Sequence, residues 1–309
     1  MAGSSKKVIM AALVGNLLVS ITKFTAAYLT RSSAMFSEGI HSLVDTGNQV
    51  LLLYGLKRSK LPADKHFPFG HGKEIYFWSF VVAILIFAVG AGISIYEGIK
   101  HIIEPVEVKD AYINYIVLSI AIVFEGAAWL FAYREFKKDN TKFSIIKSVK
   151  VGKDPVMFVV LFEDSAALLG LFVAMLGIFL SDYTGILIFD GIASVIIGVI
   201  LALTAMWLAV ETKGLLIGES ADPDIVRSIK ALANEFDEVD YINEVLTMHM
   251  GPQYILVNLS IDFHDQVKAG KIEQVISDMD KRIKQKFPLV KRIFVEAEAR
   301  GELKDNINE

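Results

Sequence analysis

Long apolar stretches are the feature that most restricts how this chain folds. Its first 210 residues contain six such stretches, each about 20 residues long or more, which is enough for a helix to cross a hydrocarbon core of about 30 Å. Because lipid offers the backbone no hydrogen-bond partners, we predict six transmembrane helices in an α-helical membrane protein. The stretches cover residues 8–29, 34–56, 75–98, 112–133, 156–180 and 186–210.

The distribution of lysine and arginine predicts the orientation. The N-terminal tail and the second and fourth connections are rich in them, whereas the first, third and fifth connections contain only Arg31, Lys100 and Lys109. Basic residues concentrate on the cytoplasmic side of a membrane. We therefore predict a multi-pass protein of the cell (inner) membrane with both termini in the cytoplasm.

The pattern changes after the last apolar stretch. Residues 222–236 and 270–286 have helical periodicity, and 241–249, 254–263 and 290–298 are typical of strands, the first two joined at Gly251-Pro252. This order predicts a small α+β cytoplasmic domain. The predicted division is a transport domain at 1–212, the α+β domain at 213–300 and a polar tail at 301–309.

Composition excludes several functions. The chain has no cysteine, which rules out disulfides, thiolate metal sites and a cysteine nucleophile. Its C-terminal part is acidic, so no nucleic-acid partner is expected. No HExxH zinc-protease pattern is present, which disfavours an intramembrane hydrolase, and we expect no enzyme activity and no organic cofactor.

Ionisable residues inside the second stretch need a reason, because each costs about 2.5–3.5 kcal/mol in the hydrocarbon region. His41 and Asp45 are four residues apart, and Glu38 precedes His41 by three, so all three share one helix face. This spacing lets an imidazole and a carboxylate converge on one ion. The alternative is that the three groups only satisfy one another or the backbone.

The fifth stretch contains the adjacent pair Glu163 and Asp164. Neighbours on a helix point about 100° apart, so one carboxylate can face the second stretch while the other faces a water path or caps a neighbouring helix. Two carboxylates at this depth need a cation or protons to neutralise them. A site that alternates between metal and protons is a proton-for-metal exchanger.

For the other ionisable groups in the apolar stretches we make simpler predictions. Glu125 either relays protons or pairs with Lys23. Glu38 is a second candidate for a proton path. We expect the side chain of Lys23 to reach the outer membrane interface. Asp190, near the outer boundary, is expected to be solvated. One imidazole with carboxylates suits Zn²⁺ as the transported substrate and also accepts Mn²⁺, Fe²⁺ or Co²⁺.

Several segments together resemble the cation diffusion facilitator family. They are SEGIHSLVDTGNQ, FPFGHGKE, EDSAALLGL, FDGIASVIIG and LLIGES, in this order along the chain. The resemblance implies a homodimeric antiporter of divalent metal and protons that exports a cytoplasmic ion such as Zn²⁺. It also implies a ferredoxin-like fold for the cytoplasmic domain and a transport site between the second and fifth spans.

By position, the resemblance assigns metal binding to His41, Asp45 and Asp164. The family usually has a histidine four residues before the last of these, where this chain has Val160, and Glu163 is our replacement ligand. This departure resembles the branch related to the mitochondrial zinc transporter.

Secondary metal sites are also implied by the resemblance. Asp64, His66 and His71 resemble an interfacial site in the second connection, for which a plain surface loop is the alternative. In the C-terminal domain His249, His264 and Glu296 are near family ligand positions, although Phe294 stands where a histidine is common. The leading hypothesis is secondary active efflux of a divalent cation, with lipid, protons and a second copy as partners; the alternative is a membrane-embedded metal sensor without transport.

Overall fold

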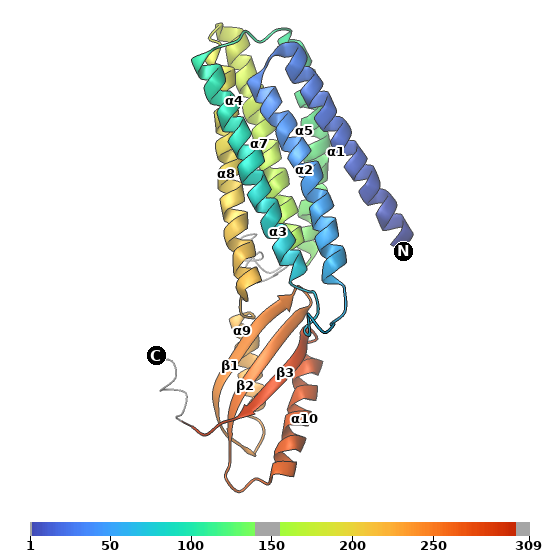
Figure 1. Ribbon diagram of the computed structural model, residues 1–309, viewed down its shortest axis with the longest axis vertical. Helices are drawn as coiled ribbons and strands as arrows, with labels where there is room; N and C mark the ends of the chain where they lie inside the picture. Colours follow the sequence, from blue (N-terminus) through green and yellow to red (C-terminus); the bar gives the residue numbers. More distant parts are fainter. Residues whose placement is uncertain (1, 140–154, 301–309) are drawn as a thin grey trace. The chain divides into compact units, whose positions relative to one another are not determined.

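The computed structural model describes residues 2–139 and 155–300, with the side chains of 2–15, 135–139 and 157 left out. The polar tail predicted at 301–309 and most of the basic fourth connection lie outside the described residues. The first part of the chain forms long helices (Figure 1). They are α1 (Ala2–Thr30), α2 (Ser33–Ser59), α3 (Glu74–Leu85), the π-helix η1 (Ile86–Ala91), α4 (Gly92–Ile103), α5 (Ala111–Asp139), α7 (Pro155–Thr184) and α8 (Ile188–Ile217).

Four helical stretches in the described part of the chain are long and apolar enough to cross a membrane. They cover Glu74–Ile103, Ala111–Arg134, Phe158–Thr184 and Ile188–Ile217. Helix α2 has 27 residues, but polar groups along its length, including Glu38, His41 and Asp45, lower its hydropathy. Half of α1 has no described side chains. The predicted count of six spans therefore stays a prediction.

The third apolar stretch is one helical rod with a π-helical segment in its middle. Helix α8 packs tightly along this rod through glycines. A Cβ atom on Gly198 would lie 3.0 Å from the carbonyl oxygen of Ala91, and one on Gly191 would lie 2.9 Å from that of Gly98. Small residues thus let the two backbones touch, as is common between membrane helices. The length of the apolar stretch at 75–98 predicted a helix here, but not the π-helical segment within it.

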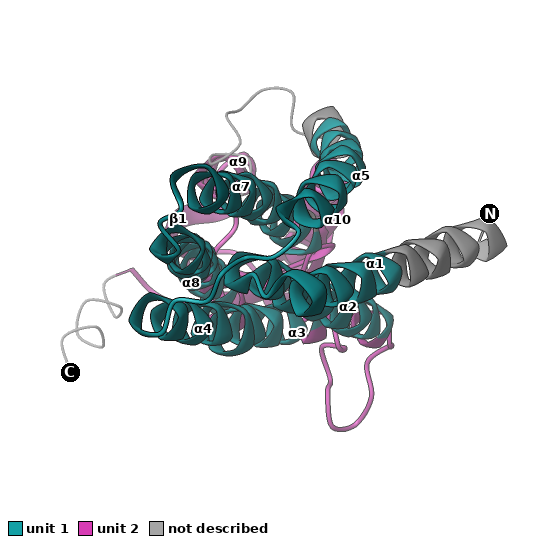
Figure 2. Ribbon diagram, turned by 90° about the horizontal axis from the view of Figure 1, so that it is seen from above, with its two compact units in different colours: residues 1–57, 75–213 teal, residues 58–74, 214–309 magenta. Residues whose placement is uncertain are grey.

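The chain divides into two compact units (Figure 2). The first contains residues 1–57 and 75–213, and the second contains 58–74 and 214–309. In the first unit the helices are seen end-on in Figure 2, and α5 packs against both α7 and α1. The connection 58–74 thus belongs with the C-terminal unit, although it is inserted between two membrane helices in the sequence. Gly72 permits this packing, because a Cβ atom there would collide with the carbonyl oxygen of Met250.

The second unit contains the predicted α-β-β-α-β succession, which the structure confirms. The elements are α9 (Pro223–Ala233), β1 (Val239–Gly251), β2 (Tyr254–Phe263), α10 (Ala269–Lys286) and β3 (Val290–Ala297). Strands β1 and β2 form an antiparallel hairpin, and β3 pairs with β2 in parallel, which gives the order β1-β2-β3. The ferredoxin-like classification stays a prediction.

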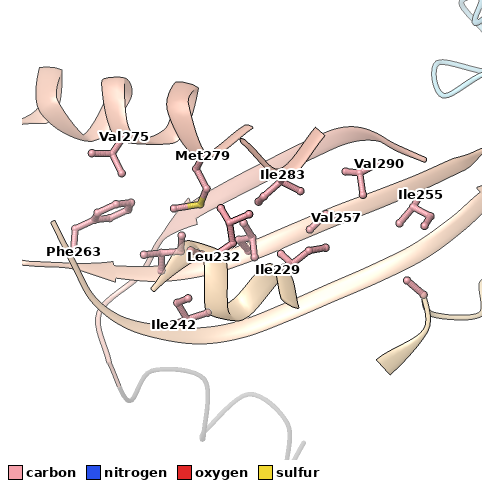
Figure 3. Packing of buried hydrophobic residues seen from close by; sticks show 14 residues of the cluster. Ile229, Leu232, Ile242, Ile255, Val257, Phe263, Val275, Met279, Ile283 and Val290 are labelled. Atoms are coloured by element: carbon pink, nitrogen blue, oxygen red, sulfur yellow. The ribbon is translucent and has the colours of Figure 1, made fainter. Parts of the chain in front are cut away.

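The core of this unit lies between the sheet and the two helices (Figure 3). Alternate residues of β2 are buried because successive side chains of a strand point to opposite faces. Ile229 and Leu232 of α9 and Met279 and Ile283 of α10 pack onto this face. The buried residues of β2 are Ile255, Val257, Leu259, Ile261 and Phe263.

Candidate functional site

A cavity of about 560 Å³ lies among helices α1, α2, α5 and α7 of the first unit. Three of the four predicted transport-site residues, Asp45, Glu163 and Asp164, line it. Glu125 of α5 lines it as well. The other polar lining residues are Asn16, Ser42 and Gln49. The helices therefore bring carboxylates that are far apart in the sequence to one hollow inside the bundle.

Helix α2 places His41 beside this cavity through its contact with Asp45. The Nδ1 atom of His41 lies 3.2 Å from Oδ1 of Asp45, one helical turn away, and His41 is only 1% exposed. Among the described residues, neither ring nitrogen of His41 has a hydrogen-bond partner. A buried imidazole with unsatisfied nitrogens is suited to bind a ligand that enters from the cavity.

Glu163 joins α7 to α2 at the same place. Its Oε1 accepts a hydrogen bond of 2.5 Å from the Nδ2 atom of Asn48, and its carboxyl group interacts directly with that of Asp45. Two carboxyl groups in contact need a proton or a cation between them. Asn48 did not stand out in the sequence, although it lies three residues after Asp45 and so shares its helix face.

Asp164 also lines the cavity, as does Val160 one turn earlier on α7. Both carboxylates of the adjacent pair therefore serve the same hollow. In residues 2–139 and 155–300, however, no three histidine, aspartate or glutamate side chains are grouped closely enough to hold a metal ion. The four predicted ligands surround the cavity without forming an assembled coordination shell.

Lys23 does not reach the membrane interface, so that expectation was wrong. Its side chain is fully buried and its Nζ donates to Glu38 Oε2 at 3.1 Å, to Ser42 Oγ at 2.8 Å and to Glu125 Oε1 at 2.9 Å. Two carboxylates inside the bundle offset its charge, so it need not extend to water. Of the two roles expected for Glu125, the pairing with Lys23 is confirmed. A proton path through Glu38 and Glu125 stays a prediction.

Asp190 is fully buried and not solvated, which corrects a second expectation. Its carboxylate accepts hydrogen bonds from Ser32 Oγ at 2.5 Å, from the backbone N–H of Ser33 at 2.5 Å and from Ser33 Oγ at 2.9 Å. These groups lie at the start of α2, where the helix dipole favours a negative charge. Asp190 thus anchors the start of α2 to α8.

The candidates in the second connection form a local cluster. Asp64 Oδ2 is hydrogen-bonded to Nε2 of His71 at 3.0 Å, and Asp64 Oδ1 accepts the backbone N–H groups of His66 and Phe67, each at 2.8 Å. The hydrogen bond to His71, followed by that from Phe67, holds the pKa of Asp64 below its ordinary value. The structure brings Asp64 and His71 together, whereas His66 contributes its backbone to this cluster.

The candidates in the C-terminal domain lie apart from one another. His249 lies opposite Ile255 near the start of β2, while His264 follows the end of that strand. At about 3.3 Å per residue the two histidines are separated by roughly the length of the strand, about 30 Å. Glu296 lies beside Ser260. His249 is buried, and His264 is exposed with its Nδ1 3.5 Å from Asp240. The structure therefore does not bring His249, His264 and Glu296 into one site within the chain.

Comparison with known proteins relates this geometry to a family. The model of the cation efflux transmembrane domain matches residues 9–217. The human mitochondrial proton-coupled zinc antiporter SLC30A9 is 32% identical over 263 residues, which cover 84% of this chain and 46% of that protein. Metal tolerance protein C4 of Arabidopsis thaliana is 30% identical over 85% of this chain and 58% of its own length.

A bacterial relative matches over nearly its whole length. The manganese efflux system protein MneP of Bacillus subtilis is 27% identical, over 94% of this chain and 95% of its own length. The chain spans only about half the length of the mitochondrial relatives. The family model alone covers well over half of the chain. The chain therefore belongs to the cation efflux family, the cation diffusion facilitators that its motifs resemble, whose members are membrane transporters and not enzymes.

Proposed function

We propose that this protein is a secondary active transporter that exports a divalent metal cation from the cytoplasm in exchange for protons, with Zn²⁺ as the first candidate. The observation that carries the proposal is the cavity lined by Asp45, Glu163 and Asp164, with the unsatisfied ring of His41 beside it. The relationship to a proton-coupled zinc antiporter supports the same activity.

The chemistry of these residues supports exchange. The contact between the carboxyl groups of Asp45 and Glu163 is stable when a proton lies between them, and also when a divalent cation does. Metal binding requires deprotonated ligands, so arrival of the ion releases protons and its departure allows their return. Rocking of the helices around the cavity then exposes it to each side of the membrane in turn.

The identity of the ion depends on the ligand set. One imidazole with three carboxylates suits Zn²⁺, and a set rich in oxygen also accepts Mn²⁺, Fe²⁺ or Co²⁺. Val160 stands where most of the family has a histidine, so this chain lacks that nitrogen ligand. Oxygen atoms therefore make up a larger share of its ligand set. A relative named for manganese efflux makes Mn²⁺ the main alternative.

The proposed topology has six membrane spans, both termini in the cytoplasm of a cell (inner) membrane, and a homodimer. Helices α1 and α2 are included as spans because the charged side chains of Lys23 and Glu38 neutralise each other inside the bundle. Lys23 of α1 pairs with Glu38 of α2, and neither needs to face lipid. Residues 1–212 are then the transport domain and 213–300 the cytoplasmic domain, except that the connection 58–74 packs with the C-terminal unit.

Proteoliposomes test this function. The purified full-length protein is reconstituted with a pH-reporting dye inside, and Zn²⁺, Mn²⁺, Fe²⁺, Co²⁺ and Ca²⁺ are added in turn. We expect a proton flux with Zn²⁺ and a smaller one or none with Ca²⁺, which prefers more oxygen ligands. Zn²⁺ binding in detergent without any flux in liposomes would contradict transport and favour a sensor.

A further inference from the structure

Lys23 is coordinated in the same manner as a bound cation. An ammonium group has three N–H donors, and those of Lys23 are matched by three oxygens, from Glu38, Ser42 and Glu125, at 2.8–3.1 Å. The side chain is fully buried. Its positive charge is therefore stabilised by these three groups and not by water.

Three helices contribute to this cluster and a fourth leaves space for it. Helix α1 supplies Lys23, α2 supplies Glu38 and Ser42, and α5 supplies Glu125. On α7, a Cβ atom added to Gly170 would collide with Oε1 of Glu38. The absence of a side chain at Gly170 thus gives the Glu38 carboxylate its position.

The two carboxylates use only part of their capacity. Glu38 Oε1 and Glu125 Oε2 are buried and have no hydrogen-bond partner among the described residues. One ammonium accompanies two carboxylates, so the cluster has more oxygen ligands and more negative charge than a single lysine satisfies. Oxygen atoms of this kind are the ligands that divalent cations select.

The cluster forms part of the wall of the transport cavity. Ser42 and Glu125 line the cavity together with Asp45 and Asp164. Glu38 is buried behind this wall and is joined to Glu125 through Lys23. Without Lys23, a divalent ion that reaches the cavity would meet the Glu125 carboxylate at the wall, with the Glu38 carboxylate behind it. Removing one member of a buried ion pair leaves an uncompensated charge, which a mobile cation can neutralise.

We propose that Lys23 is a tethered cation that occupies a second cation position at the wall of this cavity, formed by Glu38, Ser42 and Glu125, and thereby determines that a single divalent ion is exchanged in the bundle. This inference rests on the proposed function, because it assigns the exchanged ion to His41, Asp45, Glu163 and Asp164. Glu38 and Glu125 then hold Lys23 and do not bind the transported ion.

Counting bound ions tests the proposal without measuring transport. Full-length wild type and Lys23→Met are purified in detergent, and bound Zn²⁺ and Mn²⁺ per chain are measured by equilibrium dialysis. We expect Lys23→Met to bind about one more ion per chain than wild type, and Lys23→Met/Glu125→Gln to lose this additional ion. A folded Lys23→Met variant with the wild-type count would overturn the proposal.

A neutral triple variant covers the case in which Lys23→Met does not fold. Lys23→Met/Glu38→Gln/Glu125→Gln removes the three charges together and should bind as many ions as wild type. A lower count would show that Glu38 or Glu125 binds the exchanged ion and would also overturn the proposal. If wild type binds metal but drives no proton flux in liposomes, the proposed function fails while the count still decides the role of Lys23.

Discussion

Two clusters of histidine and carboxylate in this protein satisfy their polar atoms in different ways. In the helix bundle, Asp45 interacts with both His41 and Glu163 at a cavity, and both ring nitrogens of His41 and Oδ1 of Asp45 have no hydrogen-bond partner in the described part of the chain. In the connection 58–74, Asp64 accepts bonds from two backbone N–H groups as well as from His71. Both ring nitrogens of His41 are left for an ion, whereas in the loop, of the buried side-chain atoms that the structure describes, only Nδ1 of His71 lacks a hydrogen-bond partner, and Asp64 holds its own turn.

This difference shows that residue types alone do not define a metal site. A carboxylate in an exposed loop can be satisfied by water and by the backbone, so its presence needs no ligand. A carboxylate in the middle of a bundle helix, such as Asp45 or Glu163, is away from the free backbone N–H groups of helix ends, so its partners are other side chains, protons or ions. The same His and Asp pairing therefore indicates exchange chemistry in one place and a turn in the other.

The largest effect is expected at Asp45. Asp45→Ala removes the carboxylate that contacts both His41 and Glu163, so the cavity loses its central ligand. We expect a loss of Zn²⁺-driven proton flux in proteoliposomes of about 100-fold or more, at the upper end of what ligand-shell changes cause. Normal flux in Asp45→Ala would reject the cavity as the transport site and remove the contrast with the loop cluster.

The next effect concerns stability. Lys23→Met leaves Glu38 buried without its cation, and breaking such a pair costs about 3–5 kcal/mol. The matched control is Arg58→Ala, which breaks the half-exposed pair with Glu74 at 3.1 Å and should cost about 0–1 kcal/mol. Thermal unfolding in detergent measures both. Equal shifts in melting temperature would show that burial of the charges makes no difference here.

Glu163→Gln should have a smaller effect on transport. The amide keeps the volume of the side chain but loses the negative charge beside Asp45, while Asn48 can still bond to its oxygen. We expect about a tenfold loss of Zn²⁺ flux and a changed preference between Zn²⁺ and Mn²⁺. The ion panel in proteoliposomes gives both quantities. An effect as large as that of Asp45→Ala would make Glu163 an equal ligand.

The smallest effect is expected in the loop cluster. The pKa of Asp64 is depressed by His71, so the stabilising bond is present above the ordinary aspartate pKa and is lost as pH falls through the lower, folded-state pKa. His71→Ala should raise the pKa of Asp64 toward its ordinary value and bring the loss of loop order to higher pH.

Hydrogen exchange of the backbone amides of His66 and Phe67, followed against pH, measures this change in the loop. Transport by His71→Ala should be reduced far less than transport by Asp45→Ala. If His71→Ala lost as much transport as Asp45→Ala, the loop cluster would have to take part in the exchange of metal and protons.

Much of the architecture was predictable from local patterns. The length of the apolar stretches predicted the long helices, because lipid leaves the backbone no other hydrogen-bond partners. The pattern at 254–263 predicted β2. The pairing of Lys23 with Glu125 was one of two open possibilities, since a helix face shows which residues lie together but not which helix they meet. The roles of Asn48 and Gly170 were not predictable for the same reason.

The sequence by itself determined the family, the membrane character and the residues that are costly to bury, because composition, periodicity and ordered motifs are local properties. Only the tertiary structure decided that Asp45 and Glu163 touch, that Lys23 lies inside the bundle, and that residues 58–74 belong with the C-terminal unit. Each of these depends on how separate helices and strands pack. Packing sets which side chains share a space with no water, and in such a space charges must satisfy one another.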